Sequence, residues 1–236
     1  MQKNLGVYEP TLLEMMELML RVLCDQRPII ADAIFIHGSI GNGRIDAALL
    51  SEAFKIYNES SCKFVVINGL TADHCAKRNI GYPGYEIWLK LLLRWGIPRD
   101  KILLTPPSEH TAAESENFLL MAKERGWRIV VIESMPHHQA RCFLQIVATM
   151  KELSFYPRVF NTTICNVDWS LEVQRRVMAG KNALGQKDEQ GAFLDLVRGE
   201  LERIKKYAVV SPRWASHSTI KEALDYLRDR DTKRPS

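Results

Sequence analysis

The stretch ADAIFIHGSIGNGR, residues 31–44, decides the fold. It starts with a short apolar run rich in strand-forming residues, which stops at His37 and Gly38. A glycine-rich segment follows, and beyond it apolar residues recur at helical spacing. A strand without polar interruption indicates burial on both faces, as in a parallel sheet. The stretch is therefore typical of the first strand–loop–helix unit of an α/β domain.

The same order of elements recurs further along the chain. Apolar runs at residues 63–67, 101–104 and 128–132 each end in a loop with polar, Gly or Pro residues, and a helical pattern follows each. A weaker strand is predicted near residues 155–164. Repeated units with right-handed crossovers predict a Rossmann-like, three-layer α/β/α fold with a mostly parallel, doubly wound sheet of about five strands.

Three parts of the chain are predicted from these patterns. Residues 1–27 contain an amphipathic helix that is expected to pack on the core. Residues 28–168 form the α/β domain, and residues 169–236 form a helical C-terminal extension. The helical segments of that extension are predicted at residues 171–178, 193–207 and 220–227.

Composition is that of an ordinary globular protein, with 46% hydrophobic and 25% charged residues. No apolar run reaches the roughly 18–20 residues that span a bilayer, so we expect no membrane partner and a cytoplasmic location. The five cysteines are scattered without a C-x-x-C pair, which argues against a disulfide framework and a zinc site. Cys142, beside a basic residue, is either a reactive thiol or a small buried hydrophobe, and we favour the second.

The net charge of +4 comes from residues 171–236, which hold 14 Lys and Arg against 10 Asp and Glu. A basic tail can contact nucleic acid or an acidic surface. Here the charges alternate in sign along helical segments, which is typical of a solvated face and argues against nucleic acid as a partner. The oligomeric state is left open, and a homo-oligomer is compatible with the sequence.

The glycine-rich segment is the first candidate ligand-binding loop. Glycines let backbone amides approach a ligand closely, and a helix N-terminus favours an anion. Arg44 adds a planar fork that suits phosphate or carboxylate. The spacing is neither G-x-G-x-x-G nor a P-loop, so a tight turn with a surface arginine explains it equally well. The candidate ligand-binding residues here are Gly38, Ser39, Gly41, Asn42, Gly43 and Arg44.

The loop after the third predicted strand carries His110, Thr111 and Glu114. Thr111 and Glu114 have the spacing of a capping box, which on its own is purely structural. The helix dipole should bias His110 toward the neutral form, which suits acid–base work. We therefore take His110 and Glu114 as candidate catalytic residues and Thr111 as a candidate ligand-binding residue.

The loop after the fourth predicted strand carries Ser134, His138 and Arg141. His138 and Arg141 are three residues apart on an opening helix, so they share a face and can point at one ligand. His138 is the principal catalytic candidate, and Ser134 and Arg141 are candidate ligand-binding residues. No H-E-x-x-H motif accompanies the histidines, so no metal site is predicted. The alternative is a pair of surface histidines.

Asn68, Gly69 and Glu86 are weaker candidates for ligand binding. Asn68 could orient a ligand, and Glu86 could accept a hydroxyl or ribose proton. A turn and an acidic first helical turn explain them equally well. There is no G-x-S-x-G elbow, and no cysteine has an obvious base partner in the sequence, so a covalent mechanism is not indicated.

These motifs, in this order, resemble those of the YdcF/SanA/ElyC-like family of domains of unknown function, over roughly residues 31–165. A helix beginning R-x-x-A-A falls at residues 44–48, and G-[IV]-P falls at 96–98. A loop of the N-T-x-E-x-A kind matches 110–114, and H-x-x-R matches 138–141. The resemblance implies a Rossmann-like domain with polar residues at the carboxyl edge of its sheet. It implies no agreed reaction, and S-adenosylmethionine or another nucleotide is the cofactor it suggests.

Together the loops predict a site for a phosphorylated or nucleotide-like small molecule, because ligands bind at the carboxyl ends of the strands in open α/β sheets. In the first hypothesis the protein is an enzyme, in which Arg44 and Arg141 hold the anion and His138 is the acid or base. This hypothesis requires the two arginines to lie on the same side of the site. The second hypothesis is a non-catalytic module that binds a metabolite such as S-adenosylmethionine. The third is an interaction protein that acts through its basic helical tail.

Overall fold

A computed structural model describes residues 9–38, 43–164, 199–205 and 217–232 of the protein. Its centre is a five-stranded, all-parallel sheet with strand order β3-β2-β1-β4-β5. The strands are β1 (Ala33–Ile36), β2 (Phe64–Asn68), β3 (Ile102–Thr105), β4 (Ile129–Ser134) and β5 (Arg158–Thr163). The predicted fold class is confirmed, and all five strands lie where the apolar runs place them.

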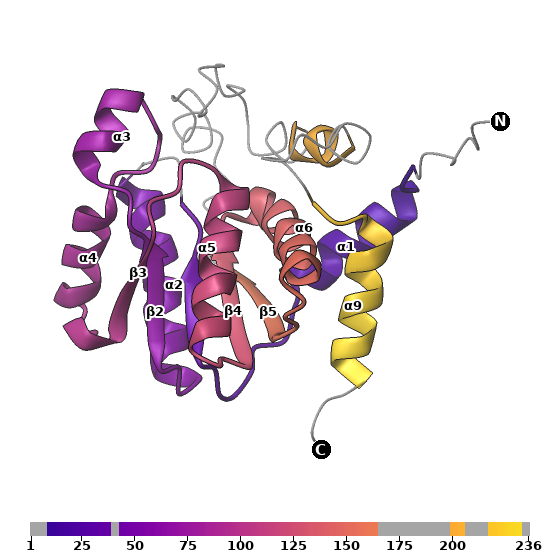
Figure 1. Ribbon diagram of the computed structural model, residues 1–236, viewed down its shortest axis with the longest axis horizontal. Coiled ribbons are helices and arrows are strands. Elements are labelled where there is room, and N and C mark those ends of the chain that lie inside the picture. Colours follow the sequence, from indigo (N-terminus) through magenta and orange to yellow (C-terminus); the bar gives the residue numbers. More distant parts are fainter. Residues whose placement is uncertain (1–8, 39–42, 165–198, 206–216, 233–236) are drawn as a thin grey trace.

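Helices cover both faces of the sheet (Figure 1). They are α1 (Leu12–Leu23), α2 (Gly43–Glu59), α3 (Ala72–Arg78), α4 (Tyr85–Arg94), α5 (Thr111–Glu124), α6 (Pro136–Leu153) and α9 (Ile220–Thr232), with a 3-10 turn at Arg99–Lys101. Two hydrophobic clusters fill the layers: α2, α3 and α4 contribute to one, and α1, α5, α6 and α9 contribute to the other. Figure 1 shows α5 and α6 in front of the sheet and α2 behind it.

The central strand β1 explains why the deciding stretch has no polar interruption. Ala33 and Phe35 belong to the cluster beneath α5 and α6, whereas Ile34 and Ile36 belong to the cluster beneath α2. Successive side chains of a strand point to opposite faces, so a strand covered on both faces must be apolar throughout. All four residues are fully buried.

Residues 72–78 form a helix, α3, where the sequence pattern indicates a polar loop, so that prediction is wrong. Thr71 is the N-cap and accepts a hydrogen bond from the His74 amide at 3.2 Å. Asn79 ends the helix in the left-handed conformation, with φ of 52°. Only Cys75 is buried. A helix of two turns with one buried position leaves no apolar periodicity to detect.

The predicted N-terminal helix is present as α1. Thr11 and Glu14 form a reciprocal capping box at its start. Its buried face, Met15, Leu18 and Val22, packs in the cluster that α6 and α9 share. The predicted helix at residues 220–227 lies in α9, and residues 199–205 of the preceding predicted segment are helical. The predicted helix at 171–178 lies outside the described residues.

Side chains of α9 and Asp25 cover the outer edge of β5. The Val159 amide donates to the Tyr226 hydroxyl at 2.7 Å, and Arg230 donates to the Val159 carbonyl at 2.7 Å. The Asn161 amide donates to the Asp25 carboxylate at 2.9 Å. An edge strand normally presents unpaired backbone groups that can recruit another strand. Here side chains bond these groups in place of a sixth strand.

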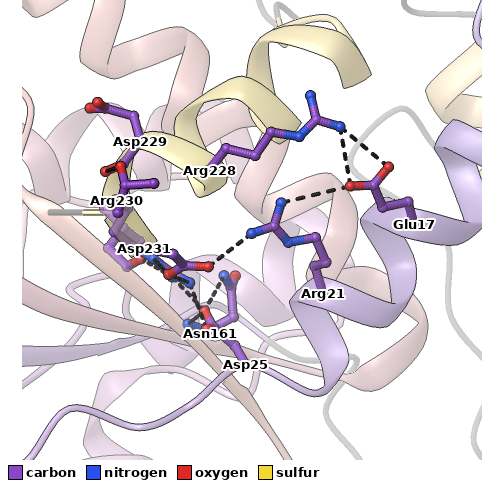
Figure 2. Close-up of polar contacts among 10 residues, drawn as sticks. Glu17, Arg21, Asp25, Asn161, Arg228, Asp229, Arg230 and Asp231 are labelled. Carbon is purple, nitrogen blue, oxygen red and sulfur yellow. Dashed lines mark hydrogen bonds and ion pairs between the residues drawn. The ribbon is translucent and has the colours of Figure 1, made fainter. Parts of the chain in front are cut away.

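Figure 2 shows how this cover is held to α1. Arg230 donates to both carboxylate oxygens of Asp25, at 2.6 and 2.7 Å, and both side chains are only 3% exposed. Nearer the surface, Arg21 of α1 pairs with Asp231, and Arg228 pairs with Glu17 of α1. The two helices and β5 therefore form one joined unit.

No helix in the described ranges is long and apolar enough to cross a membrane.

Candidate functional site

The strand order reverses between β1 and β4. From β1 the chain proceeds outward to β2 and β3, and then α5 carries it back across the sheet to β4. In sheets of this kind, the loops at the carboxyl ends of the two strands at the reversal diverge and leave a crevice for ligands. His37 follows β1, and the start of α6 follows β4. The candidate residues discussed next gather around this point.

Glu114, in the first turn of α5, joins the loops that follow β1 and β2. Its carboxylate accepts hydrogen bonds from the Gly38 amide at 3.0 Å and from Asn68 Nδ2 at 2.9 Å. The same carboxylate lies 3.4 Å from His37 Nδ1. Burial by itself raises the pKa of Glu114, but His37, the Gly38 amide and Asn68 outweigh it and hold the pKa below its ordinary value. Glu114 is therefore a buried, ionised group.

The N-cap of α5 is His110, so the predicted capping box of Thr111 and Glu114 is wrong. His110 Nδ1 accepts from the Ala113 amide at 3.2 Å, and Thr111 is the first residue of the helix. Glu114 is drawn to His37 because a buried carboxylate gains more from charge-assisted hydrogen bonds than from an exposed cap. His110 is exposed, and among the described residues the cap is the one hydrogen bond of its side chain.

Asn68 and Gly69 hold the loops after β2 and β3 together. Asn68 Nδ2 donates to the Ser108 carbonyl at 2.7 Å, and its Oδ1 accepts from the Ser108 amide at 3.1 Å. With Glu114 as a further acceptor, the Asn68 amide is fully occupied. At Gly69 a Cβ atom would lie 2.2 Å from the Thr105 carbonyl oxygen, so only glycine fits. Both residues therefore hold the loops of the site in place.

His138 and Arg141 converge on one carboxylate, as their spacing predicts, but it belongs to Glu200 of the protein itself. Arg141 donates from Nε at 2.6 Å and from Nη2 at 3.3 Å, and His138 Nδ1 lies 3.5 Å away. Arg203 adds a further bond at 2.6 Å. Burial raises the pKa of Glu200, but Arg141 and His138 bring it well below its ordinary value. The side chains of His138 and Arg141 remain 13% and 17% exposed.

Thr111 connects the group of His138, Arg141 and Glu200 to α5. Its hydroxyl lies 3.2 Å from His138 Nε2, so both ring nitrogens of His138 have a polar neighbour. Thr111 and Glu114 are on the same helix turn, which places the His37 pair and the His138 pair beside each other. The loops after all four of the strands β1 to β4 thus meet in one cluster.

Cys142 lies one helical turn after His138 on α6, and the two histidines His37 and His138 affect the pKa of its thiol. Burial raises the pKa of its thiol, but His138 and His37 reverse this and bring the pKa to about 6. In His37, burial lowers the pKa, but Cys142 and Glu114 raise it to about 9. The sequence favours a small buried hydrophobe at this position. The complete burial of Cys142 agrees with that interpretation, but the sequence does not predict the effect of the two histidines on its pKa. The four-residue spacing from His138 is the one indication in the sequence.

The remaining candidates do not join the cluster through described side chains. Ser134 is buried at the end of β4, where its carbonyl accepts from Thr163 at 2.8 Å. Glu86 is exposed on α4, and its carboxylate accepts from the Ala72 amide at 2.9 Å, which holds α3 to α4. Both residues have local structural partners. For Glu86 this agrees with the alternative that it is an acidic residue of a first helical turn.

The first glycine-rich loop is described only at its ends. Gly38 belongs to the cluster through its amide, and a Cβ atom there would lie 2.9 Å from Glu114 Oε1. Gly43 and Arg44 begin α2, which places the backbone of Arg44 at the carboxyl edge of the sheet. The Arg44 side chain lies outside the described atoms, as do the candidate residues Ser39, Gly41 and Asn42.

Fold and site define a class of protein: a doubly wound, parallel α/β protein with histidine, carboxylate and thiol groups clustered where its strand order reverses. Within the described residues, no group of three His, Cys, Asp or Glu side chains is arranged to hold a metal ion. No protein-family model matches the chain. No curated protein is significantly similar to it.

Proposed function

We propose that the protein binds a phosphorylated or nucleotide-like small molecule at the carboxyl ends of β1 and β4, and that His138 exchanges a proton with it. The observation that supports this proposal is the buried Glu200 carboxylate, which Arg141 and His138 hold at the strand reversal. Arginine binds carboxylate and phosphate through the same pair of parallel donors. The groups that hold Glu200 are therefore suited to hold a ligand anion.

Each residue of the site has a distinct role in this proposal. Arg141 fixes the anion, and His138, which keeps part of its surface accessible, transfers the proton. Arg44, at the start of α2, is a second candidate to contact the anion. We also propose that the chain is related to the YdcF/SanA/ElyC-like domains, whose motif order it resembles. S-adenosylmethionine is for that reason one of the ligands to test.

The test is calorimetric binding of inorganic phosphate, AMP and S-adenosylmethionine to the wild type and to two arginine variants. Arg141→Gln should weaken binding roughly tenfold or more, because a charge-assisted bond contributes about 1.5–3 kcal/mol. Arg94→Gln, on the exposed face of α4, is the matched control and should bind like the wild type. Equal affinity in all three proteins, or no binding of any probe at millimolar concentration, contradicts the proposal.

One observation favours a binding module that does not turn its ligand over. Both ring nitrogens of His138 already face polar groups, namely Thr111 and Glu200. Under this alternative, His138→Gln weakens binding a few-fold, and chromatography shows no conversion of a bound ligand by the wild type. Conversion by the wild type that His138→Gln abolishes supports the enzyme.

A further inference from the structure

A third histidine–carboxylate pair lies at the carboxyl edge of the sheet, outside the cluster described above. Nε2 of His74, on α3, lies 2.6 Å from Oε1 of Glu109, in the loop that follows β3. Arg78, one turn further along α3, donates to Oε2 of the same carboxylate at 3.3 Å. α3 and the start of α5 lie at the same end of the sheet (Figure 1). The pair therefore joins the loops after β2 and β3 at the edge where such sheets bind ligands.

Glu109 determines which nitrogen of His74 carries the proton. Hydrogen bonds from His74 and Arg78 outweigh burial and hold the pKa of Glu109 below its ordinary value, so its carboxylate is ionised and can only accept. His74 must therefore donate from Nε2, which leaves the lone pair of the neutral ring on Nδ1. No hydrogen bond joins Nδ1 to a residue that the structure describes, and the side chain is 43% exposed. An oriented acceptor is thus open to a ligand.

His110, in the same loop as Glu109, presents the opposite group. Its Nδ1 accepts from the Ala113 amide, so the proton of the neutral ring lies on Nε2, the nitrogen that can donate. His138 has a polar neighbour at both of its ring nitrogens. Of these three histidines at the carboxyl edge, His74 is therefore the one that can accept a hydrogen bond from a ligand hydroxyl group.

The segment from Glu109 to Thr111 connects His74 with the proposed anion site. Glu109 bonds with His74 at one end of the segment, and the Thr111 hydroxyl lies 3.2 Å from His138 Nε2 at the other. Two residues of chain span at most about 7 Å. His138 shares its carboxylate partner with Arg141. A nucleotide whose phosphate lies at Arg141 can therefore extend along this segment toward α3.

We propose that His74 and Glu109 form a subsite for a hydroxyl group of the ligand. His74 Nδ1 accepts a hydrogen bond from a sugar hydroxyl, and Glu109 fixes the ring in the orientation that this bond requires. The inference rests on the proposed function, because it places the phosphate of the same ligand at Arg141. It narrows the ligand to a nucleotide or sugar phosphate with a free hydroxyl group. A site that hydrogen-bonds a hydroxyl group discriminates against the analogue that lacks it.

The test compares, by calorimetry, AMP with dideoxy-AMP, which has the same phosphate and base but lacks both ribose hydroxyl groups. The wild type should bind AMP roughly threefold to tenfold more tightly. His74→Gln keeps an amide donor near the position of Nε2 for the bond to Glu109, but it has no acceptor at the position of Nδ1. This variant should bind the two nucleotides equally and inorganic phosphate like the wild type. Ala76→Ser, an exposed change on α3, is the control and should keep the preference for AMP.

The outcomes separate the subsite from the proposed function. Equal affinity of the wild type for the two nucleotides refutes the subsite alone. A preference for AMP that His74→Gln retains also refutes it, because glutamine preserves a purely structural bond to Glu109. If the wild type binds neither phosphate nor a nucleotide, the proposed function fails and the subsite with it.

The orientation of the ring is measured without any ligand. In NMR spectra the Nε2 proton of His74 should exchange slowly with solvent in the wild type, because Glu109 accepts it. In Glu109→Ala the same proton should exchange rapidly. Equally fast exchange in the two proteins overturns the proposal.

Discussion

At the scale of single residues, the site consists of side chains whose partners lie far away in the sequence. Glu114 illustrates this: its spacing from Thr111 is that of a helix cap, yet its carboxylate bonds with Gly38 and Asn68. Local spacing shows which groups are near along one helix, and it correctly pairs His138 with Arg141. It cannot show His37 meeting Glu114 or Glu200 meeting Arg141, because tertiary packing alone makes these contacts.

Glu200 is the residue whose substitution best tests whether an internal anion occupies the ligand position. Glu200→Gln removes the negative charge beside Arg141 but keeps the shape of the side chain. We expect phosphate to bind roughly tenfold more tightly, measured by calorimetry, because the competing carboxylate is gone. Stability should fall by about 1–3 kcal/mol, since the partly buried Arg141 loses its ion pair with Glu200. Glu116→Gln, an exposed change on α5, is the control. Weaker phosphate binding in Glu200→Gln would show that Glu200 helps to bind the ligand.

Gly69 tests how closely the loops at the carboxyl edge must approach. Gly69→Ala places a methyl group 2.2 Å from the Thr105 carbonyl, which is backbone and cannot rotate away. We expect a loss of about 1–3 kcal/mol in the free energy of unfolding, measured in urea. At Gly96, where φ is 95°, no described atom lies within 4 Å of the position that an added methyl group would take. Gly96→Ala should therefore cost only about 1–2 kcal/mol, from the backbone conformation. An unchanged stability in Gly69→Ala would mean that the loops separate easily.

At the scale of elements, the strands were predictable and the short helix was not. Strands buried on both faces need apolar runs, and those runs stand out in any part of the sequence. In α3 one buried residue, Cys75, is too little to show a period, and the helix depends on its caps Thr71 and Asn79. The type of a long element can be predicted from its hydrophobic periodicity. A short element forms because of its caps and tertiary contacts, which the periodicity does not show.

The contact between α9 and β5 gives a prediction at this scale. Arg230→Met removes the bonds to Asp25 and to the Val159 carbonyl and leaves the Asp25 carboxylate buried without its cation. We expect a loss of about 3–5 kcal/mol in a urea titration. Arg228→Met on the same helix removes only exposed pairs, with Glu17 and Asp225, and should cost less than about 1 kcal/mol. Equal effects of the two substitutions would mean that the buried pair does not secure α9.

At the scale of the whole molecule, the pH dependence of stability follows from the buried histidines. Burial lowers the pKa of His137 to about 4, against 6.5 in an unfolded chain. Between these values the unfolded chain binds a proton that the folded protein does not, so stability falls as the pH falls from about 6.5 to 4. The full loss is about 3 kcal/mol, since one pKa unit corresponds to about 1.4 kcal/mol. Urea titrations of the wild type and His137→Gln at several pH values test this, and equal slopes would contradict it.

Cys142 and His37, in contrast, add no pH dependence to the stability over the neutral range. In the folded protein the thiol has lost its proton above pH about 6, and His37 keeps its proton up to about 9. An unfolded chain between pH 6.5 and 9.0 has the opposite arrangement, with a neutral imidazole and a protonated thiol. The number of bound protons is the same in both states, so this pair contributes no slope there. Stability measurements in this pH range therefore do not report on the pair.

The covered edge of β5 also imposes an order in time. Asp25 is translated before β5, but Tyr226 and Arg230 follow that strand by more than fifty residues. At about 5–20 residues per second, a ribosome needs roughly 3–13 s to add that length. For that interval, each nascent chain carries a finished strand whose outer backbone groups lack the bonds from α9. Neighbouring chains on one messenger RNA can pair through such edges, so slow translation of this region should lower the yield of monomeric protein.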